Sequence, residues 1–99
     1  MKPYSYSFYK FFTNFSNKTK SDIITLLRDG PLSVKGITRK IGGEQSKVSH
    51  SLRDLRECHI LNVRHEGKQR IYSLNEETVT PILEIVERHV RKNCLRCGR

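Results

Sequence analysis

The apolar residues between Val34 and Ile60 recur at helical intervals in two short blocks, and a glycine pair, Gly42–Gly43, separates the blocks. The second block begins near Gln45, and its apolar residues form one stripe, made of Val48, Leu52 and Leu55. Thr38 supplies the small residue that the first helix of a helix-turn-helix needs. The pattern predicts two helices joined by a tight turn.

The other side of the second helix is polar and basic. Its residues are Gln45, Ser46, Lys47, Ser49, His50 and Arg53. A helix with an apolar back and a front of short polar and cationic side chains suits the major groove of DNA. We therefore expect helix 45–58 to read duplex DNA.

From Ile60 onward the period of the apolar residues changes from helical to two. The segment 61–74 reads as a hairpin that turns at Gly67, and a hairpin after a helix-turn-helix is a wing. Cations at its tip and flanks, Arg64, Lys68 and Arg70, are placed to contact a phosphate backbone or to enter a minor groove.

Helices are also expected on both sides of this unit. Seven of the eight aromatic residues lie in the first fifteen positions, and an aromatic stripe there predicts an amphipathic helix. A second helix should run from Lys18 to Asp29, after the N-cap residues Ser16–Asn17 and before the stop at Gly30–Pro31. The last helix should begin with Thr80 as N-cap and Pro81 as the first helical residue.

The first and last helices carry more apolar surface than a thin-cored chain of 99 residues can cover. One interpretation is that the aromatic helix docks on its own core. The other is that a second subunit shares it, and the two are compatible. The expected homodimer interface consists of Phe8, Phe11, Phe12, Phe15, Ile82, Val86 and Val90, with Tyr4 at the start of the same stripe.

Net charge and the distribution of apolar residues limit which partners and which location we expect for the protein. The formal net charge of +9 favours a polyanionic partner, although ribosome-associated and membrane-surface proteins share that bias. No apolar run approaches the roughly 20 residues of a membrane span, and the start lacks the features of a signal peptide, so we expect a cytoplasmic protein without membrane contact. We expect one winged helix-turn-helix domain over 1–93 and a basic CxxC tail over 94–99.

The tail holds the pair Cys94-x-x-Cys97, which is half of a structural zinc site. Zinc needs four ligands, so the pair could bind a metal, form a redox-active disulfide or remain an unligated tail. No resident cofactor is expected beyond zinc at this pair. Neighbours such as Ser49–His50 point about 100° apart on a helix and cannot form a catalytic dyad, so no catalytic residue is predicted and the chain is not expected to be an enzyme.

About sixty residues, from Phe15 to Leu74, resemble the winged-helix repressors of the ArsR/SmtB family. The resemblance rests on three segments: SNKTKSDIITLL at the second helix, EQSKVSHSLRDLRE at the recognition helix and EGKQRIYSL at the wing. It implies a symmetric dimer, built from the first and last helices, that represses transcription. The sequence departs from the family at His50 and Ser51, so operator preference does not transfer.

The family's usual thiolate metal site maps onto Ser33 and Lys35, so its cysteines are absent here. Glu87 and His89 mimic half of the site that other members carry on the last helix. The leading hypothesis is a fold that is mainly α with a small β-hairpin, acting as a dimeric DNA-binding regulator of the repressor type. The alternatives are a winged-helix protein-interaction module and a metal- or thiol-responsive sensor that uses Cys94 and Cys97.

Overall fold

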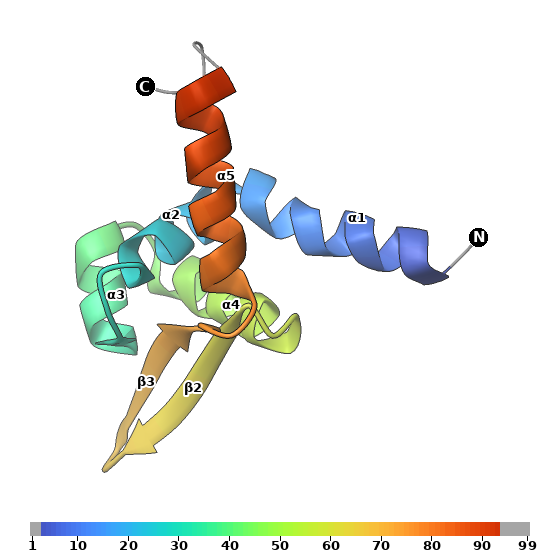
Figure 1. Cartoon of the computed structure of the whole chain (residues 1–99). Helices are drawn as coiled ribbons and strands as arrows, with labels where there is room; N and C mark the ends of the chain where they lie inside the picture. Colours follow the sequence, from blue (N-terminus) through green and yellow to red (C-terminus); the bar gives the residue numbers. More distant parts are fainter. Residues whose placement is uncertain (1–2, 94–99) are drawn as a thin grey trace.

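The computed structural model describes residues 3–93, with side chains from residue 7 onward. The fold consists of five helices and a small three-stranded sheet, whose β2–β3 hairpin projects from one side of the helices (Figure 1). The elements are α1 (Pro3–Ser16), α2 (Lys18–Leu27), β1 (Leu32–Ser33), α3 (Val34–Ile41), α4 (Gln45–Glu57), β2 (Leu61–Glu66), β3 (Gln69–Leu74) and α5 (Val79–Asn93). Within the described part of the chain, no helix has the length and apolar character needed to cross a membrane.

Helices α2, α3 and α4 form the centre of the fold, and polar side chains fix where the first two begin. The Asn17 side chain accepts a hydrogen bond from the Lys20 amide at 3.0 Å, and the Ser33 hydroxyl accepts one from the Gly36 amide at 3.1 Å. These helices and the sheet enclose one core, made of Ile23, Ile24, Leu27, Ile37, Val48, Leu52, Leu55, Ile60, Leu61, Tyr72, Leu74 and Val79. The predicted helix-turn-helix is confirmed.

The turn between α3 and α4 depends on two glycines in left-handed backbone conformations. Gly42 and Gly43 both have φ of 78°, a region that costs other residues steric strain. Glu44 is the N-cap of α4, and its carboxylate makes no capping hydrogen bond. The charge of Glu44 therefore sits one residue before the first turn of the helix.

Helix α4 ends at a left-handed residue that is not glycine. His59 has φ of 59°, a conformation that histidine adopts more often than most other residues with a side chain. Its amide donates to the Arg56 carbonyl at 2.9 Å, and the Ile60 amide donates to the Leu55 carbonyl at 3.0 Å. This pair of bonds defines a Schellman motif, which turns the chain from α4 directly into the sheet.

The predicted hairpin is present, and the sheet has one strand more than expected. β2 and β3 pair antiparallel from Leu61↔Leu74 to Glu66↔Gln69, with Gly67 at φ of 62° in the turn. The two-residue β1 pairs antiparallel with β3, which gives the strand order β1-β3-β2. A strand of two residues is too short to show alternation, so periodicity could not reveal it.

The prediction for the start of the last helix was wrong. α5 begins at Val79, and the amides of Val79 and Thr80 donate to the Asn75 carbonyl at 2.9 and 3.3 Å, so Thr80 is helical rather than an N-cap. Val79 is buried in the core, which draws the first residue of the helix inward. Pro81 still lies in the first turn of the helix. Amides in the first turn make no hydrogen bond within the helix, so the missing amide hydrogen of proline costs nothing there.

Helices α1 and α5 extend from this body in different directions (Figure 1). On α1, Phe11 and Phe15 pack partly against the core, whereas Phe8 and Phe12 remain about half exposed. The predicted aromatic stripe is therefore divided between the chain's own core and its surface. The Tyr4 side chain lies outside the described residues.

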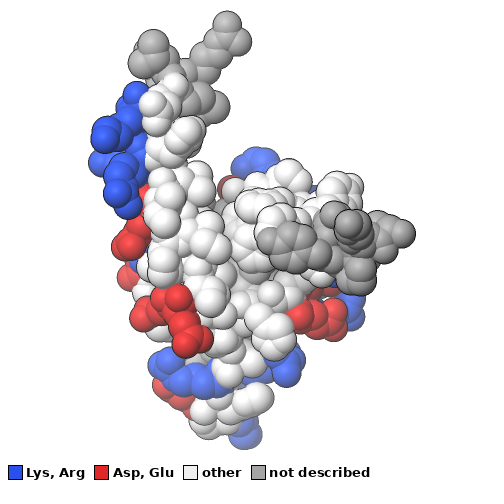
Figure 2. Space-filling model, turned by 45° about the vertical axis from the view of Figure 1, so that its right-hand side comes forward, with Lys and Arg blue, Asp and Glu red and all other residues white. Residues whose placement is uncertain are grey.

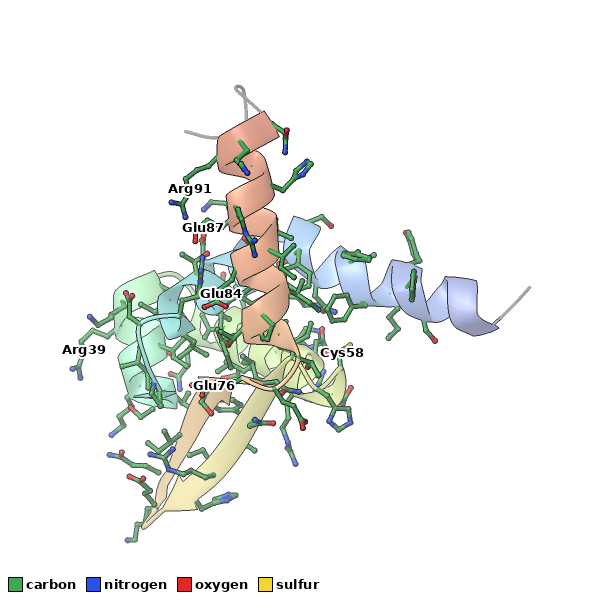
Figure 3. All side chains as sticks on the ribbon, in the orientation of Figure 1. Arg39, Cys58, Glu76, Glu84, Glu87 and Arg91 are labelled. Carbon is green, nitrogen blue, oxygen red and sulfur yellow. The ribbon has the colours of Figure 1, made fainter. Side chains whose placement is uncertain are left out.

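The apolar surface of α5 is likewise only partly covered. Leu83 packs against the core, but Ile85 is 58% and Val86 is 49% exposed. Glu87 ties α5 to the body, because its Oε1 lies 3.4 Å from Nη2 of Arg28, the C-cap residue of α2, and 3.1 Å from Nη2 of Arg91. Figure 3 shows Glu84, Glu87 and Arg91 along one side of α5. A broad uncharged surface runs along α5 toward α1, with charged side chains at its margins (Figure 2).

Candidate nucleic-acid interface

Helix α4 presents its predicted reading residues on the surface of the molecule. The exposed set is Gln45, Ser46, Lys47, Ser49, His50 and Arg53. Val48, Leu52 and Leu55 hold the opposite side of the helix in the core, each with 2% or less of its surface exposed. The core therefore fixes the rotation of α4 that turns the polar side outward.

A groove of about 250 Å³ lies between the N-terminal half of α4 and the wing. Gln45 and Ser49 line it from α4, and Lys68 and Arg70 line it from the hairpin. Lys35 of α3 also lines this groove. Residues from three elements thus meet on one surface that carries three cationic side chains.

A second groove, of about 270 Å³, shares Ser49 and Arg70 with the first. Arg53 and Arg56 of α4 complete its cationic lining, and none of the acidic residues within 3–93 lines it. Guanidinium groups gathered in this way attract phosphate and can bind it through two parallel hydrogen bonds. The two grooves make a continuous cationic surface from the start of α4 to the wing.

Sequence reasoning missed two residues of this surface. Arg56 lies three residues after Arg53 and seven after Ser49, so a helical projection of α4 could have included it. Lys35 reaches the groove because β1 and α3 pack beside β3, and that packing left no periodic signal in the sequence.

The wing places its cations on two different faces. Side chains alternate along a strand, so Arg70 shares the face of Tyr72, which is buried in the core. Arg64 pairs with Ile71 across the hairpin and occupies the other face, where its Nε donates to Glu66 Oε2 at 2.7 Å. The structure therefore brings Lys68 and Arg70 to α4 and leaves Arg64 apart from them.

His50 and Arg53 form a pair on the exposed side of α4. Nη2 of Arg53 lies 2.7 Å from Nδ1 of His50, and Nε2 of His50 lies 3.5 Å from Oδ2 of Asp54. A guanidinium can only donate, so Nδ1 must accept. With Nδ1 as the acceptor, the ring proton lies on Nε2, which faces the Asp54 carboxylate.

Cys94 and Cys97 lie outside the described residues, so metal binding or a disulfide at this pair stays a prediction. Within residues 3–93, no group of three His, Cys, Asp or Glu side chains is arranged to hold a metal ion. Cys58 is half-buried and packs against the core, as expected for a small apolar side chain.

Comparison with known proteins shows which family this part of the chain resembles. Residues 17–63 match the family model described as "Bacterial regulatory protein, arsR family". The HTH-type transcriptional regulator NmtR of Mycobacterium tuberculosis (strain ATCC 25618 / H37Rv) is 42% identical over 62 residues, which are 63% of this chain and 52% of that protein. The chain thus aligns with about half the length of this curated relative.

Solved structures share the fold over most of the chain. HlyU from Vibrio cholerae N16961 superposes with a TM-score of 0.76 at 26% identity, over 89% of this chain and 96% of that one. The homodimeric winged helix-turn-helix domain of Mb0332 from Mycobacterium bovis superposes with a TM-score of 0.72 at 20% identity, over 89% and 85%. Over residues 17–63, which hold the helix-turn-helix, the chain is similar to the ArsR family of bacterial regulatory proteins.

Proposed function

We propose that this chain is a homodimeric, sequence-specific DNA-binding transcriptional regulator that acts as a repressor. The family that residues 17–63 resemble consists of DNA-binding transcription regulators, which are not enzymes, and this similarity supports the proposal. The observation that carries the proposal is the cationic surface on which Ser49 and Arg53 of α4 meet Arg70 of the wing. Such a surface, beside an exposed polar helix, fits the phosphates and base edges of one major groove.

The residues divide by the part of DNA that they can reach. Gln45, Ser46, Ser49 and His50 have short or planar polar side chains near the start of α4, suited to base edges. The longer cations are suited to phosphates, which position the protein without reading the sequence. They are Lys47, Arg53, Lys68 and Arg70, with Arg64 on the outer face of the wing.

A dimer would use the surface that α1 and α5 leave uncovered. Phe8, Phe12 and Val86 are about half exposed, and Ile82 and Val90 of α5 are partly exposed. Phe11 and Phe15 complete the aromatic cluster on its core side, where the ring of Phe11 contacts the rings of Phe12 and Phe15. A two-fold axis here would carry two α4 helices to successive major grooves about 34 Å apart, and the bound dimer would repress by covering a promoter.

The test is a gel shift of duplex DNA across a salt series. We expect the logarithm of the binding constant to fall linearly with the logarithm of salt concentration. The double variant Lys47→Ala/Arg53→Ala should flatten that slope by about 0.9 for each phosphate that is no longer neutralised. The charge-matched control Arg88→Ala/Lys92→Ala removes two cations from α5, which lies away from the wing, and should leave the slope nearly unchanged (Figure 1).

Equal slopes for the wild type and the Lys47/Arg53 variant would show that the DNA-binding surface lies elsewhere. Salt-insensitive binding to a protein, with little affinity for any duplex, would instead support the protein-interaction alternative.

A further inference from the structure

A series of polar contacts leads from a buried side chain of α1 toward the exposed side of α4. Asn14 is 2% exposed, and its Nδ2 donates to the carbonyls of Lys10 at 3.2 Å and Phe11 at 3.1 Å. These two bonds fix the orientation of the amide. Its Oδ1 accepts a hydrogen bond from Nζ of Lys20 at 3.4 Å.

Lys20 connects this amide to the recognition helix. Its Nζ lies 3.3 Å from Oδ2 of Asp54, and 19% of the lysine side chain is exposed. One ammonium group of α2 thus contacts both α1 and α4. Because the group is largely withdrawn from water, the carboxylate that balances its charge is held in place more firmly than in an exposed ion pair.

Asp54 in turn contacts the exposed side chains of α4 that we assign to DNA binding. The same Oδ2 that faces Lys20 lies 3.5 Å from Nε2 of His50, and Nδ1 of His50 lies 2.7 Å from Nη2 of Arg53. The contacts therefore run from the interior of α1 to two exposed side chains that we assign to DNA. Each step joins a donor to an acceptor.

We propose that Lys20 is a positioning residue for sequence reading: itself held by Asn14, it holds Asp54 and so fixes the tautomer and orientation of His50 and, through His50, the guanidinium of Arg53. The inference rests on the proposed DNA-binding function. It assigns no DNA contact to Lys20 itself.

The physical reason is preorganisation. A free arginine or histidine side chain samples several rotamers, and each one that binding immobilises costs affinity. The Asp54 carboxylate selects the imidazole with its proton on Nε2, which leaves Nδ1 as the acceptor that orients Arg53. Without Lys20, the carboxylate can turn toward solvent and the pair loses its fixed geometry.

The binding test uses two duplexes of about 30 base pairs, one enriched from a random library by the wild-type chain and one a shuffled version of it. Lys20→Met should lower the ratio of specific to non-specific affinity by about tenfold, the discrimination that one well-placed base pairing supplies. Lys20→Arg, which keeps the charge, should retain most of the ratio. The matched control is Lys18→Met, because Lys18 is on the same helix but pairs with Asp22 of that helix at 2.9 Å. It should weaken both duplexes equally.

A second measurement follows the imidazole directly. Long-range ¹H–¹⁵N spectra at about pH 8, assigned with His50→Gln, should show His50 protonated on Nε2 in the wild type. Asp54→Asn and Lys20→Met should both give a mixture of tautomers, whereas Lys18→Met should not. Asp54→Asn preserves side-chain volume, so it tests the contact even if Lys20→Met unfolds the chain.

The outcomes separate the inference from the function on which it rests. If no duplex is enriched, the proposed function fails and the positioning role fails with it, whatever tautomer His50 adopts. If a duplex is enriched but Lys20→Met matches Lys18→Met in specificity ratio and in tautomer, the DNA-binding function stands and the positioning role of Lys20 is overturned.

Discussion

The middle of the chain and its two end helices bury their apolar residues to very different extents. Ile23, Ile37 and Leu55, on α2, α3 and α4, are completely buried. On the end helices, Phe12 is 56% and Ile85 is 58% exposed. Residues of similar hydrophobicity thus meet a closed core in one region and solvent in the other.

This difference in burial indicates that a single chain completes only part of its apolar packing. The central helices and the sheet satisfy each other, so their geometry, including the rotation of α4, does not depend on a partner. The end helices have apolar faces that a second copy of the chain can cover, because each face would meet its counterpart across a two-fold axis. Fold stability and assembly should therefore respond to different substitutions.

The largest effect is expected from truncating the central core. Ile37→Ala should lower the free energy of unfolding by about 2–5 kcal/mol at every protein concentration, because it leaves a cavity among buried neighbours. The matched change Ile85→Ala should have an effect that depends on protein concentration, since it acts through association. Urea denaturation at two concentrations measures both. A concentration-independent loss of the same size at Ile85 would erase the distinction between the two regions.

The next effect concerns assembly. Phe12→Glu or Val86→Glu would place an unpaired charge in the proposed dimer interface, at a cost of several kcal/mol, roughly enough to dissociate a micromolar dimer. Affinity for a two-site duplex should fall with the dimer, while the helical circular dichroism signal remains. Sedimentation compares these variants with Thr25→Glu, a change at an exposed position of α2. A wild-type chain that sediments as a monomer at about micromolar concentration would contradict the dimer.

A smaller effect tests the two faces of the wing. Arg70→Ala should weaken duplex binding by roughly threefold to tenfold, because Arg70 lines both grooves beside α4. Arg64→Ala removes the same charge from the other face, where Glu66 already neutralises it, and should weaken binding less. Fluorescence anisotropy at fixed salt compares them. Equal losses would mean that both faces of the wing contact DNA.

The smallest effect lies at the junction between α4 and the sheet. His59→Gly should stabilise the fold by about 1 kcal/mol, because glycine adopts the left-handed conformation without a steric penalty. Glu57→Gly, two residues earlier and still helical, should cost about 1 kcal/mol instead. Thermal unfolding distinguishes the two signs, and a destabilised His59→Gly would indicate that the imidazole has a structural role.

The parts of the fold that sequence predicted correctly have local causes. Asn17 and Ser33 cap the helices that follow them, and Gly67 turns the hairpin, each through contacts within a few residues. The prediction failed at Thr80, because the start of α5 is decided by burial of Val79 in a core built from distant segments. β1 was missed for the same reason, since its partner lies almost forty residues away on β3.

The candidate site divides in the same way. Helical periodicity alone indicated that Ser49 and Arg53 point away from the core, because the side-chain directions of one helix follow from its geometry. Periodicity could not show that Lys35 lines the same groove as Ser49, or that Lys20 contacts Asp54. In both cases the two residues lie on separate helices. Nor could charge counting show that Arg64 is held by Glu66 on the far face of the hairpin.

The two-residue strand β1 has a consequence for how the molecule avoids aggregation. By covering Ile71 and Tyr72, it makes β3 an interior strand over its apolar part and leaves β2 as the long outer edge of the sheet. That edge ends in Arg64, His65 and Glu66, and the uncovered start of β3 carries Arg70. Charged side chains on an exposed edge strand oppose the addition of a foreign strand. We therefore expect the charged edge of the projecting hairpin to disfavour strand addition, so that association of two chains would use the apolar helices instead.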